Sequence, residues 1–182
     1  MFGAKGFHET TLKEIAELAE FSVGSVYSFF ENKDDLFLNV FLRRGSEFLP
    51  GMDAVVNGPG SPLEILHGLV DYQIGFFRQH PHFGRLYLRS ASGNQAGPDT
   101  PESPDLAANY QQAMDSQADL FARGQQAGQV RDGDPVVLGR LFTGLVVAYQ
   151  SLDPAIVSDD VSSERLSLDA LHEIIDAAFR RP

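Results

Sequence analysis

The sequence predicts an all-α fold, and three observations predict it. Apolar residues recur at helical spacing, start signals precede each apolar stretch, and strand-like alternation of useful length is missing. The chain has 182 residues, of which 43% are hydrophobic, which is enough to bury a sizeable core. Cysteine is absent, which excludes disulfides, thiolate metal sites and cysteine nucleophiles.

Nothing in the sequence indicates a targeting or membrane segment. The N-terminus lacks the apolar stretch of a signal peptide. The most apolar run, residues 136–149, is interrupted by Arg140 and is shorter than the ~20 residues of a membrane span. We therefore expect this run to form a buried helix in a soluble, cytoplasmic protein without membrane partners.

Start signals divide the N-terminal part into three short helices. Thr11 and Glu14 form the pattern of a capping box, Ser22 can cap a helix over residues 23–30, and Asn32 can cap a third helix. The first two helices are separated by only three residues. This spacing is typical of a helix-turn-helix.

Breaks rich in proline and glycine punctuate the rest of the chain. We predict breaks at residues 50–62, 92–104 and 153–163. Between them, helices are predicted to start at Ser61, Pro81, Ser103, Asp134 and Ser163. The first break separates a helix-turn-helix domain of residues 1–48 from a helical domain of residues 49–182.

The second helix of the predicted pair suits the major groove of DNA. Its first residues, Val23, Gly24 and Ser25, are small, so the backbone can approach base edges closely. Val23 can contact a thymine methyl group, and Ser25 can form a hydrogen bond with a base. Tyr27 and Lys33 are long enough to reach phosphates.

The run GFHETTLKEIAELAEFSVGSVYSFFENKDDLF resembles the DNA-binding domain of the TetR (tetracycline-repressor-type) family of transcriptional regulators. The matching positions are Gly6-Phe7, Thr10-Thr11, Ile15-Ala16, Ser22-x-Gly24-x-x-Tyr27, Phe30 and Lys33. The resemblance implies that a homodimer binds double-stranded operator DNA and that its C-terminal domain holds a small-molecule effector. The DNA contacts that we expect are Thr11, Ser22, Val23, Gly24, Ser25, Tyr27, Ser28 and Lys33.

Two positions in the turn and the recognition helix depart from the family pattern. Glu20 stands where the turn usually has glycine, and a glutamate adopts the required backbone only with strain. Phe29 stands where histidine or tyrosine is common. One phosphate or base contact is therefore expected to be missing.

The first helix of the family pattern is also mostly absent, because only residues 1–5 precede Gly6. We expect Phe21 and Val26 to fill the angle between the paired helices. Without a long first helix, the apolar sides of Ile15 and Val26 are expected to be partly uncovered.

Aromatic residues recur in the second domain and suit an apolar ligand or a filled core. The residues predicted to contact the effector are Tyr72, Phe76, Tyr87, Tyr110, Phe142 and Tyr149. A buried tyrosine hydroxyl needs a partner and can orient a ligand. For each of these residues, simple core packing is an equally good interpretation.

The last two predicted helices carry wide apolar faces. Such faces suit a four-helix dimer interface, for which the predicted residues are Leu141, Leu145, Leu171, Ile175 and Phe179. An ordinary monomer core would give the same pattern. Two recognition helices that meet half-sites about one turn apart favour the dimer.

The charge and the motifs limit the classes of function that the chain can have. The net charge is −11, with −3 in residues 1–48 and −8 in residues 49–182, which opposes bulk nucleic-acid binding but permits a local reader. His80 and His82 flank a proline at a helix junction, which is no metal signature, and Asp34-Asp35 suits a helix start. No cofactor or enzyme motif is legible.

The sequence thus predicts a ligand-responsive transcriptional regulator, a repressor that a small, largely apolar effector releases from DNA. The alternative is a dimeric helical module that binds small molecules or proteins and has lost DNA binding. The short first helix, Glu20 and the acidic charge motivate this alternative.

Overall fold

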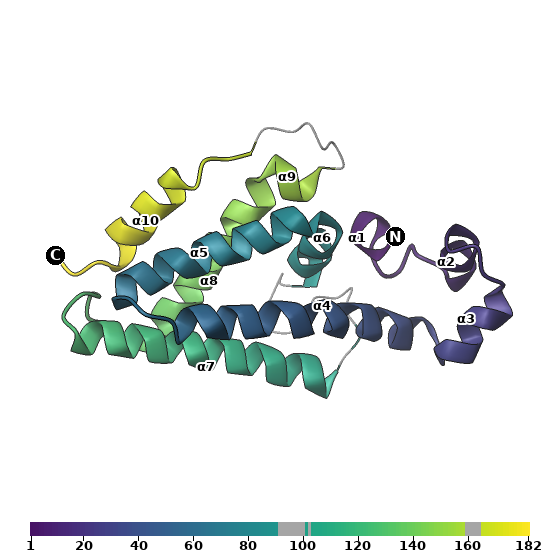
Figure 1. Cartoon of the computed structure of the whole chain (residues 1–182), viewed down its shortest axis with the longest axis horizontal. Helices are drawn as coiled ribbons and strands as arrows, with labels where there is room; N and C mark the ends of the chain where they lie inside the picture. Colours follow the sequence, from purple (N-terminus) through teal and green to yellow (C-terminus); the bar gives the residue numbers. More distant parts are fainter. Residues whose placement is uncertain (91–100, 102, 159–164) are drawn as a thin grey trace.

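The computed structural model describes residues 1–90, 101, 103–158 and 165–182, and this part of the chain is all-α, as predicted. The helices are α1 (Phe2–Lys5), α2 (Leu12–Leu18), α3 (Val23–Phe29), α4 (Lys33–Val56), α5 (Pro62–Gln79), α6 (Pro81–Ser90), α7 (Pro104–Gln126), α8 (Pro135–Leu152), α9 (Pro154–Val157) and α10 (Asp169–Phe179). Figure 1 shows α2 and α3 at one end of an elongated molecule and α10 toward the other, with α4 running between them.

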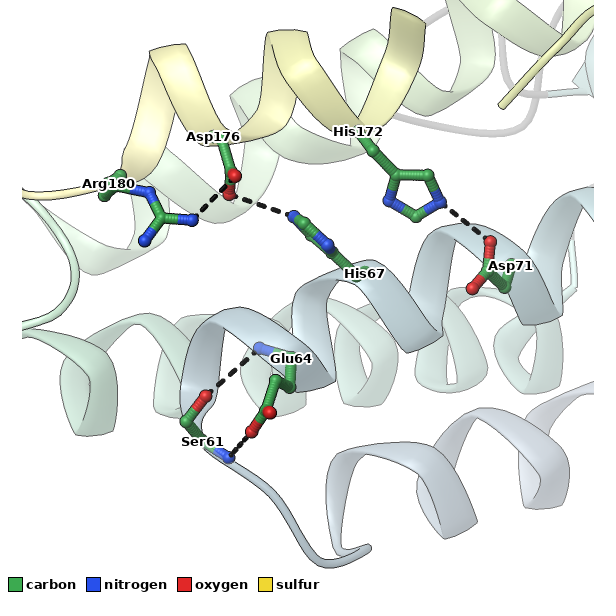
Figure 2. Close-up of polar contacts among 7 residues, drawn as sticks. All are labelled: Ser61, Glu64, His67, Asp71, His172, Asp176 and Arg180. Atoms are coloured by element: carbon green, nitrogen blue, oxygen red, sulfur yellow. Dashed lines mark hydrogen bonds and ion pairs between the residues drawn. The ribbon is translucent and has the colours of Figure 1, made fainter. Parts of the chain in front are cut away.

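The predicted helix starts are confirmed where the start signal is local. Complete capping boxes form at Thr11 and at Ser61, whose bonds with Glu64 are drawn in Figure 2. Ser22 and Asn32 each accept a backbone hydrogen bond at the N-termini of α3 and α4. Each cap satisfies a backbone N–H that has no partner inside its helix.

The predicted break at residues 50–62 is wrong in its first half. Helix α4 continues through Pro50 and Gly51 and ends at Val56, so the expected domain boundary after residue 48 lies inside a helix. The hydroxyl of Tyr72 donates a hydrogen bond to the carbonyl oxygen of Phe48 at 3.0 Å. Pro50 has no N–H for the carbonyl oxygen of Ser46, so this contact braces α4 within one turn of the interrupted hydrogen-bond pattern.

Gly51 provides the space for this contact. A Cβ atom at Gly51 would overlap with the ring and hydroxyl of Tyr72. The two helices therefore approach closely at this point, and α5 supports α4 just where proline weakens it. A tertiary contact of this kind leaves no signal in the local sequence.

The predicted helix boundaries after α6 are confirmed in part. Helices α7 and α8 begin at Pro104 and Pro135, directly after Ser103 and Asp134, as predicted. The last helix starts at Asp169, and residues 165–168 before it are not helical, so the prediction of a start at Ser163 is wrong. Most of the predicted break at 92–104 lies outside the described residues, and the break at 153–163 contains α9.

The core contains two groups of aromatic rings. One group joins α4, α5 and α6 through Phe48, Phe77 and Phe83. The other joins α7, α8 and α10 through Phe121, Phe142 and Phe179, with ring centroids 5.0 to 6.2 Å apart. Both groups are edge-to-face or tilted, as rings in cores prefer.

The contact between Tyr72 and Gly51 predicts opposite effects for two glycines of the same helix. We expect Gly51→Ala to lower the free energy of unfolding by roughly 1–3 kcal/mol, because the new methyl group collides with Tyr72. Gly45→Ala has open space and should raise it by about 0.5–1 kcal/mol through helix propensity. Urea unfolding of both variants measures the difference, and equal effects would contradict the packing argument.

Candidate nucleic-acid interface

The N-terminus of α2 is fixed by a dense set of hydrogen bonds. The Thr11 hydroxyl accepts from the Glu14 amide, and the Glu14 carboxylate accepts from the Thr11 amide at 3.0 Å. Lys5 adds an ion pair at 2.7 Å. The hydrogen bond from Lys5 and those from Thr11 lower the pKa of Glu14 to about 2. The charge of Glu14 thereby links α1 to the start of α2.

Helix α3 presents the predicted DNA contacts on an exposed face. Val23, Gly24, Tyr27 and Ser28 are all exposed, whereas Val26 on the opposite side is buried. The helix starts with small residues, so its backbone is accessible at the N-terminal end. This arrangement suits insertion into a groove with the N-terminal residues toward the bases.

A short hydroxyl chain fixes the first turn of α3. The Ser22 hydroxyl accepts from the Ser25 amide at 3.0 Å and lies 2.8 Å from the Ser25 hydroxyl. The Ser28 hydroxyl donates to the Ser25 carbonyl oxygen. The three hydroxyl groups are thus preorganised on α3, and Ser22 and Ser28 are exposed at the surface.

Lys33 has a different position from the other predicted contacts. Its ammonium donates to the carbonyl oxygen of Phe7 at 3.0 Å and lies 4.3 Å from the centre of the Phe7 ring. The side chain thus ties the start of α4 to the segment between α1 and α2. Its reach toward a phosphate competes with this structural role.

The turn between α2 and α3 shows the expected strain. Glu20 has φ 59°, the one positive φ at a non-glycine residue in the described chain. Phe21 is 61% exposed, so the prediction that it fills the angle between the helices is wrong. Val26 and Ala16 fill that angle, and the expectation that Val26 is uncovered is also wrong, because Val26 is buried. Ile15 is half-buried against the core.

The N-terminal end of the molecule, formed by α1, α2 and α3, also contacts α6 directly through α1. Gly3 lies so close to the carbonyl oxygen of His82 that a Cβ atom would clash with it. Arg89 donates to the carbonyl oxygen of Ala4 at 3.2 Å, and the rings of Phe41 and Phe83 are in contact at 5.3 Å. Helices α4 and α6 therefore form two separate connections between the ends of the molecule.

The predicted effector residues are only partly brought together. Tyr72 and Phe76 lie against Phe48, and Tyr87 lies between Phe48 and Phe77. Burial, with a smaller contribution from the neighbouring Tyr110, raises the pKa of Tyr87 to about 12. Tyr110 itself is largely exposed on α7. These residues from α5, α6 and α7 form one candidate effector region.

Phe142 and Tyr149 lie elsewhere. The fully buried ring of Phe142 is packed between Phe121 and Phe179 in the second aromatic group, and its role as an effector contact stays a prediction. Tyr149 has Arg78 and Asp153 as its charged neighbours, and burial raises the pKa of its hydroxyl. The hydroxyl of Tyr72, as described above, is used by the backbone of α4.

The helical part of the chain that carries the candidate effector region is tightly packed in this structure. A crevice between α4 and α7, lined by Met52 and Gln117, has a volume of about 10 Å³, which suits one water molecule. The aromatic rings of α4, α5 and α6 fill one another's space. An effector would therefore have to move helices apart to enter.

The exposed side of α8 is apolar. Among the described helices, α8 alone has the length and composition of a membrane span, with 28% of its residues buried, so its prediction as a buried helix is wrong for one face. Val137 and Leu141 are about half exposed and line a groove of about 610 Å³ with Gly144, Leu145 and Ala178. Arg140 also lines this groove and is solvent-exposed.

The prediction that a stripe of α10 forms the dimer interface has to be corrected. Leu171, Ile175 and Phe179 are 2%, 0% and 1% exposed, because this stripe packs into the subunit's own core. The exposed apolar residue of α10 is Ile174, at 50%. The sequence already indicated this difference, because Ile174 does not belong to the stripe of Leu171, Ile175 and Phe179, whose members are four residues apart.

Two reciprocal histidine–aspartate contacts hold α10 on α5 and thereby fix which face of α10 is exposed. Figure 2 shows His67 with Asp176 at 3.0 Å and His172 with Asp71 at 2.8 Å. Burial raises the pKa of Asp176, but the hydrogen bonds from Arg180 and His67 outweigh it and lower the pKa overall. Asp176 therefore stays ionised and keeps its bonds to both helices.

Comparisons with known proteins match the N-terminal part of the chain to one family model. Residues 1–40 match the family model described as bacterial regulatory proteins, tetR family. The fatty acid metabolism regulator protein of Bacillus subtilis (strain 168) is 19% identical over 169 residues, covering 91% of this chain and 81% of that protein.

Solved structures show the same fold. A transcriptional regulator of the TetR/AcrR family from Thermobifida fusca YX-ER1 superimposes with a TM-score of 0.64 at 24% identity, covering 97% of this chain and 88% of the other. AibR, in complex with isovaleryl coenzyme A and operator DNA, gives 0.77 at 18% identity and covers 98% and 91%. At these identities the structural likeness establishes the fold.

Relief of strain in the turn is directly testable. We expect Glu20→Gly to raise the free energy of unfolding by about 1 kcal/mol, because glycine adopts a positive φ without a Cβ clash. Glu17→Gly, a matched change inside α2, should lower it by about 1 kcal/mol. Thermal unfolding of both variants decides, and a destabilised Glu20→Gly protein would show that the turn is not strained.

Proposed function

We propose that the chain is a transcriptional regulator of the tetR family, a cytoplasmic, ligand-responsive repressor that binds operator DNA as a homodimer. The observation that carries this proposal is the exposed face of α3, whose first turn is fixed by serine hydroxyls. Its residues reach base edges, while the hydroxyl groups and N–H groups at the starts of α2 and α3 suit phosphates.

The effector domain supports a largely apolar effector. Tyr72, Phe76 and Tyr87 provide aromatic surface between α5 and α6, and Tyr110 lies beside Tyr87. Apolar and aromatic linings with few polar groups are typical of small-molecule sites. The relative AibR was solved with isovaleryl coenzyme A, and another relative is named as a regulator of fatty acid metabolism, which favours an acyl compound.

Release from DNA would follow from the two connections between the domains. Effector entry beside Tyr87 displaces α6 or α4, and both helices contact the DNA-reading end. The recognition helices of a dimer then move away from a separation of about one helical turn of DNA. The effector can do this only by binding the released shape more tightly than the DNA-bound shape.

The homodimer is proposed to form through α8 and the exposed side of α10. Leu141 and Leu145, which the sequence predicts for the interface, line the groove of α8 with Val137, and Ile174 is exposed on α10. Pairing two such surfaces makes a four-helix contact around a two-fold axis. Arg140 at the edge of the groove supplies a polar rim.

The alternative, a dimeric module that has lost DNA binding, is favoured by the surface of the turn. Leu18 and Phe21 are strongly exposed beside the strained Glu20, so this end is imperfectly covered. Both hypotheses share the effector domain and the dimer. They differ only in whether α3 reads DNA.

Selection of binding sites from random DNA duplexes tests the repressor proposal. We expect the full chain to enrich an inverted repeat whose half-sites lie about one helical turn apart. Tyr27→Phe should weaken binding to all enriched sequences alike and leave the salt dependence unchanged, because it removes a neutral hydroxyl that would donate to a phosphate. Ser151→Ala, at the far end of α8, serves as the control. Selection without any enriched sequence would favour the module that does not read DNA.

A charge placed on α8 tests the dimer. We expect Leu141→Arg to produce a monomer, because the buried charge has no partner at a two-fold contact, and to weaken operator binding by more than tenfold. Val157→Arg on α9, a residue of similar exposure, should remain dimeric. Sedimentation velocity measures both, and a dimeric Leu141→Arg protein would place the interface elsewhere.

A further inference from the structure

Two glutamines interrupt the apolar stripes of the effector domain. Gln73 lies on the buried stripe of α5 with Val70 and Phe77 and is 5% exposed. Gln150 ends the buried stripe of α8, after Val146, and is 1% exposed. Glutamine is rarely buried to this extent unless its amide has partners.

These amides lack partners. The Nε2 atom of Gln73 and both polar atoms of the Gln150 amide are buried without a hydrogen bond to any described residue. Gln117 on α7 provides an internal comparison, because it is equally buried and its amide oxygen accepts from the Thr143 hydroxyl at 2.8 Å. The protein therefore satisfies a buried amide elsewhere but leaves these amides open.

The two glutamines lie near the same ion pair. Arg78 of α5 donates to the fully buried Asp153 at 2.7 Å, which joins the ends of α5 and α8. Gln150 precedes Asp153 by three residues and Gln73 precedes Arg78 by five, so they lie about 4.5 and about 7.5 Å along their helices from this junction. The hydroxyl of Tyr149 is buried beside the same pair.

This region offers hydrogen bonds but no free charge. Arg78 and Asp153 neutralise each other, and the neighbours on both stripes are aliphatic or aromatic. A carboxylate brought here would lose its hydration without gaining a free cation, which is costly. A neutral carbonyl oxygen can accept from amide N–H groups, and an apolar body suits the surrounding side chains.

We propose that Gln73 and Gln150 form the polar end of the effector site and bind the carbonyl oxygen of a neutral, otherwise apolar ligand such as a ketone, ester or thioester. This inference rests on the proposed effector-binding function. Both amides are buried, so a ligand that enters beside Tyr87 reaches them only if α8 also moves away from α5. Binding is therefore coupled to a change of shape in the domain.

Three matched compounds test the proposal on the full-length protein. They are 4-phenylbutan-2-one, n-butylbenzene and 3-phenylpropanoate, which share a phenylethyl body and differ in the polar end. We expect calorimetry to show the ketone binding at least about fivefold more tightly than the hydrocarbon, with the carboxylate weakest. In ¹H–¹⁵N spectra the ketone should shift the side-chain amide signals of Gln73 and Gln150.

Variants assign the effect to these residues. Gln150→Leu should remove the preference for the ketone over the hydrocarbon, whereas Gln117→Leu, which changes an amide that is already paired, should retain it. If Gln150→Leu does not fold, the amide spectra of the wild-type protein and Gln73→Leu decide. A wild-type protein that ignores the ketone, amide signals that do not shift, or a preference that survives in Gln150→Leu would each overturn the proposal.

Failure of this inference differs from failure of the proposed function. The same wild-type preparation is used for selection of operator DNA. A protein that enriches an inverted repeat but does not bind the ketone remains a DNA-binding regulator with a different effector. A protein that binds the ketone through both amides but enriches no DNA retains the effector site and loses the repressor role.

Discussion

The arrangement of the whole molecule depends on the close contact between Tyr72 of α5 and Gly51 of α4. Pro50 alone would kink or end α4 at a cost of about 3 kcal/mol. Tyr72 fills the space beside Gly51 and donates to the Phe48 carbonyl oxygen within one turn of Pro50, so α5 braces α4 where it runs on to Val56. In the proposed function, a displacement of α5 would therefore reach α2 and α3 along the single helix α4.

Features that depend on neighbours in sequence could be predicted, and features that depend on distant contacts could not. The caps at Thr11, Ser22 and Ser61 formed as expected, because each needs only the three residues that follow. The continuity of α4 was missed because the stabilising hydroxyl comes from Tyr72, more than twenty residues later. The strain at Glu20 was foreseen because a positive φ is a local property of the turn.

Which apolar face meets which partner is the least predictable property. The stripe of Leu171, Ile175 and Phe179 is as apolar as a subunit interface, yet it is buried inside its own subunit. The choice is made by the paired contacts His67–Asp176 and His172–Asp71, which orient α10 on α5 and leave Ile174 outside. Helical periodicity identifies an apolar face, but only the neighbouring helix determines whether that face remains available for a second copy.

One aromatic group touches both connections to the DNA-reading end. Phe48 belongs to α4, and Tyr87 and Phe83 belong to α6, which contacts α1. A ligand that separates these rings would move α4 and α6 together. Its preference for the open shape would therefore act on a single change of shape rather than on two independent ones. Moving a population from 1:99 to 99:1 needs a preference of about 10⁴-fold. A closely packed domain that must open for its ligand favours such a preference, because the closed shape excludes the ligand almost completely.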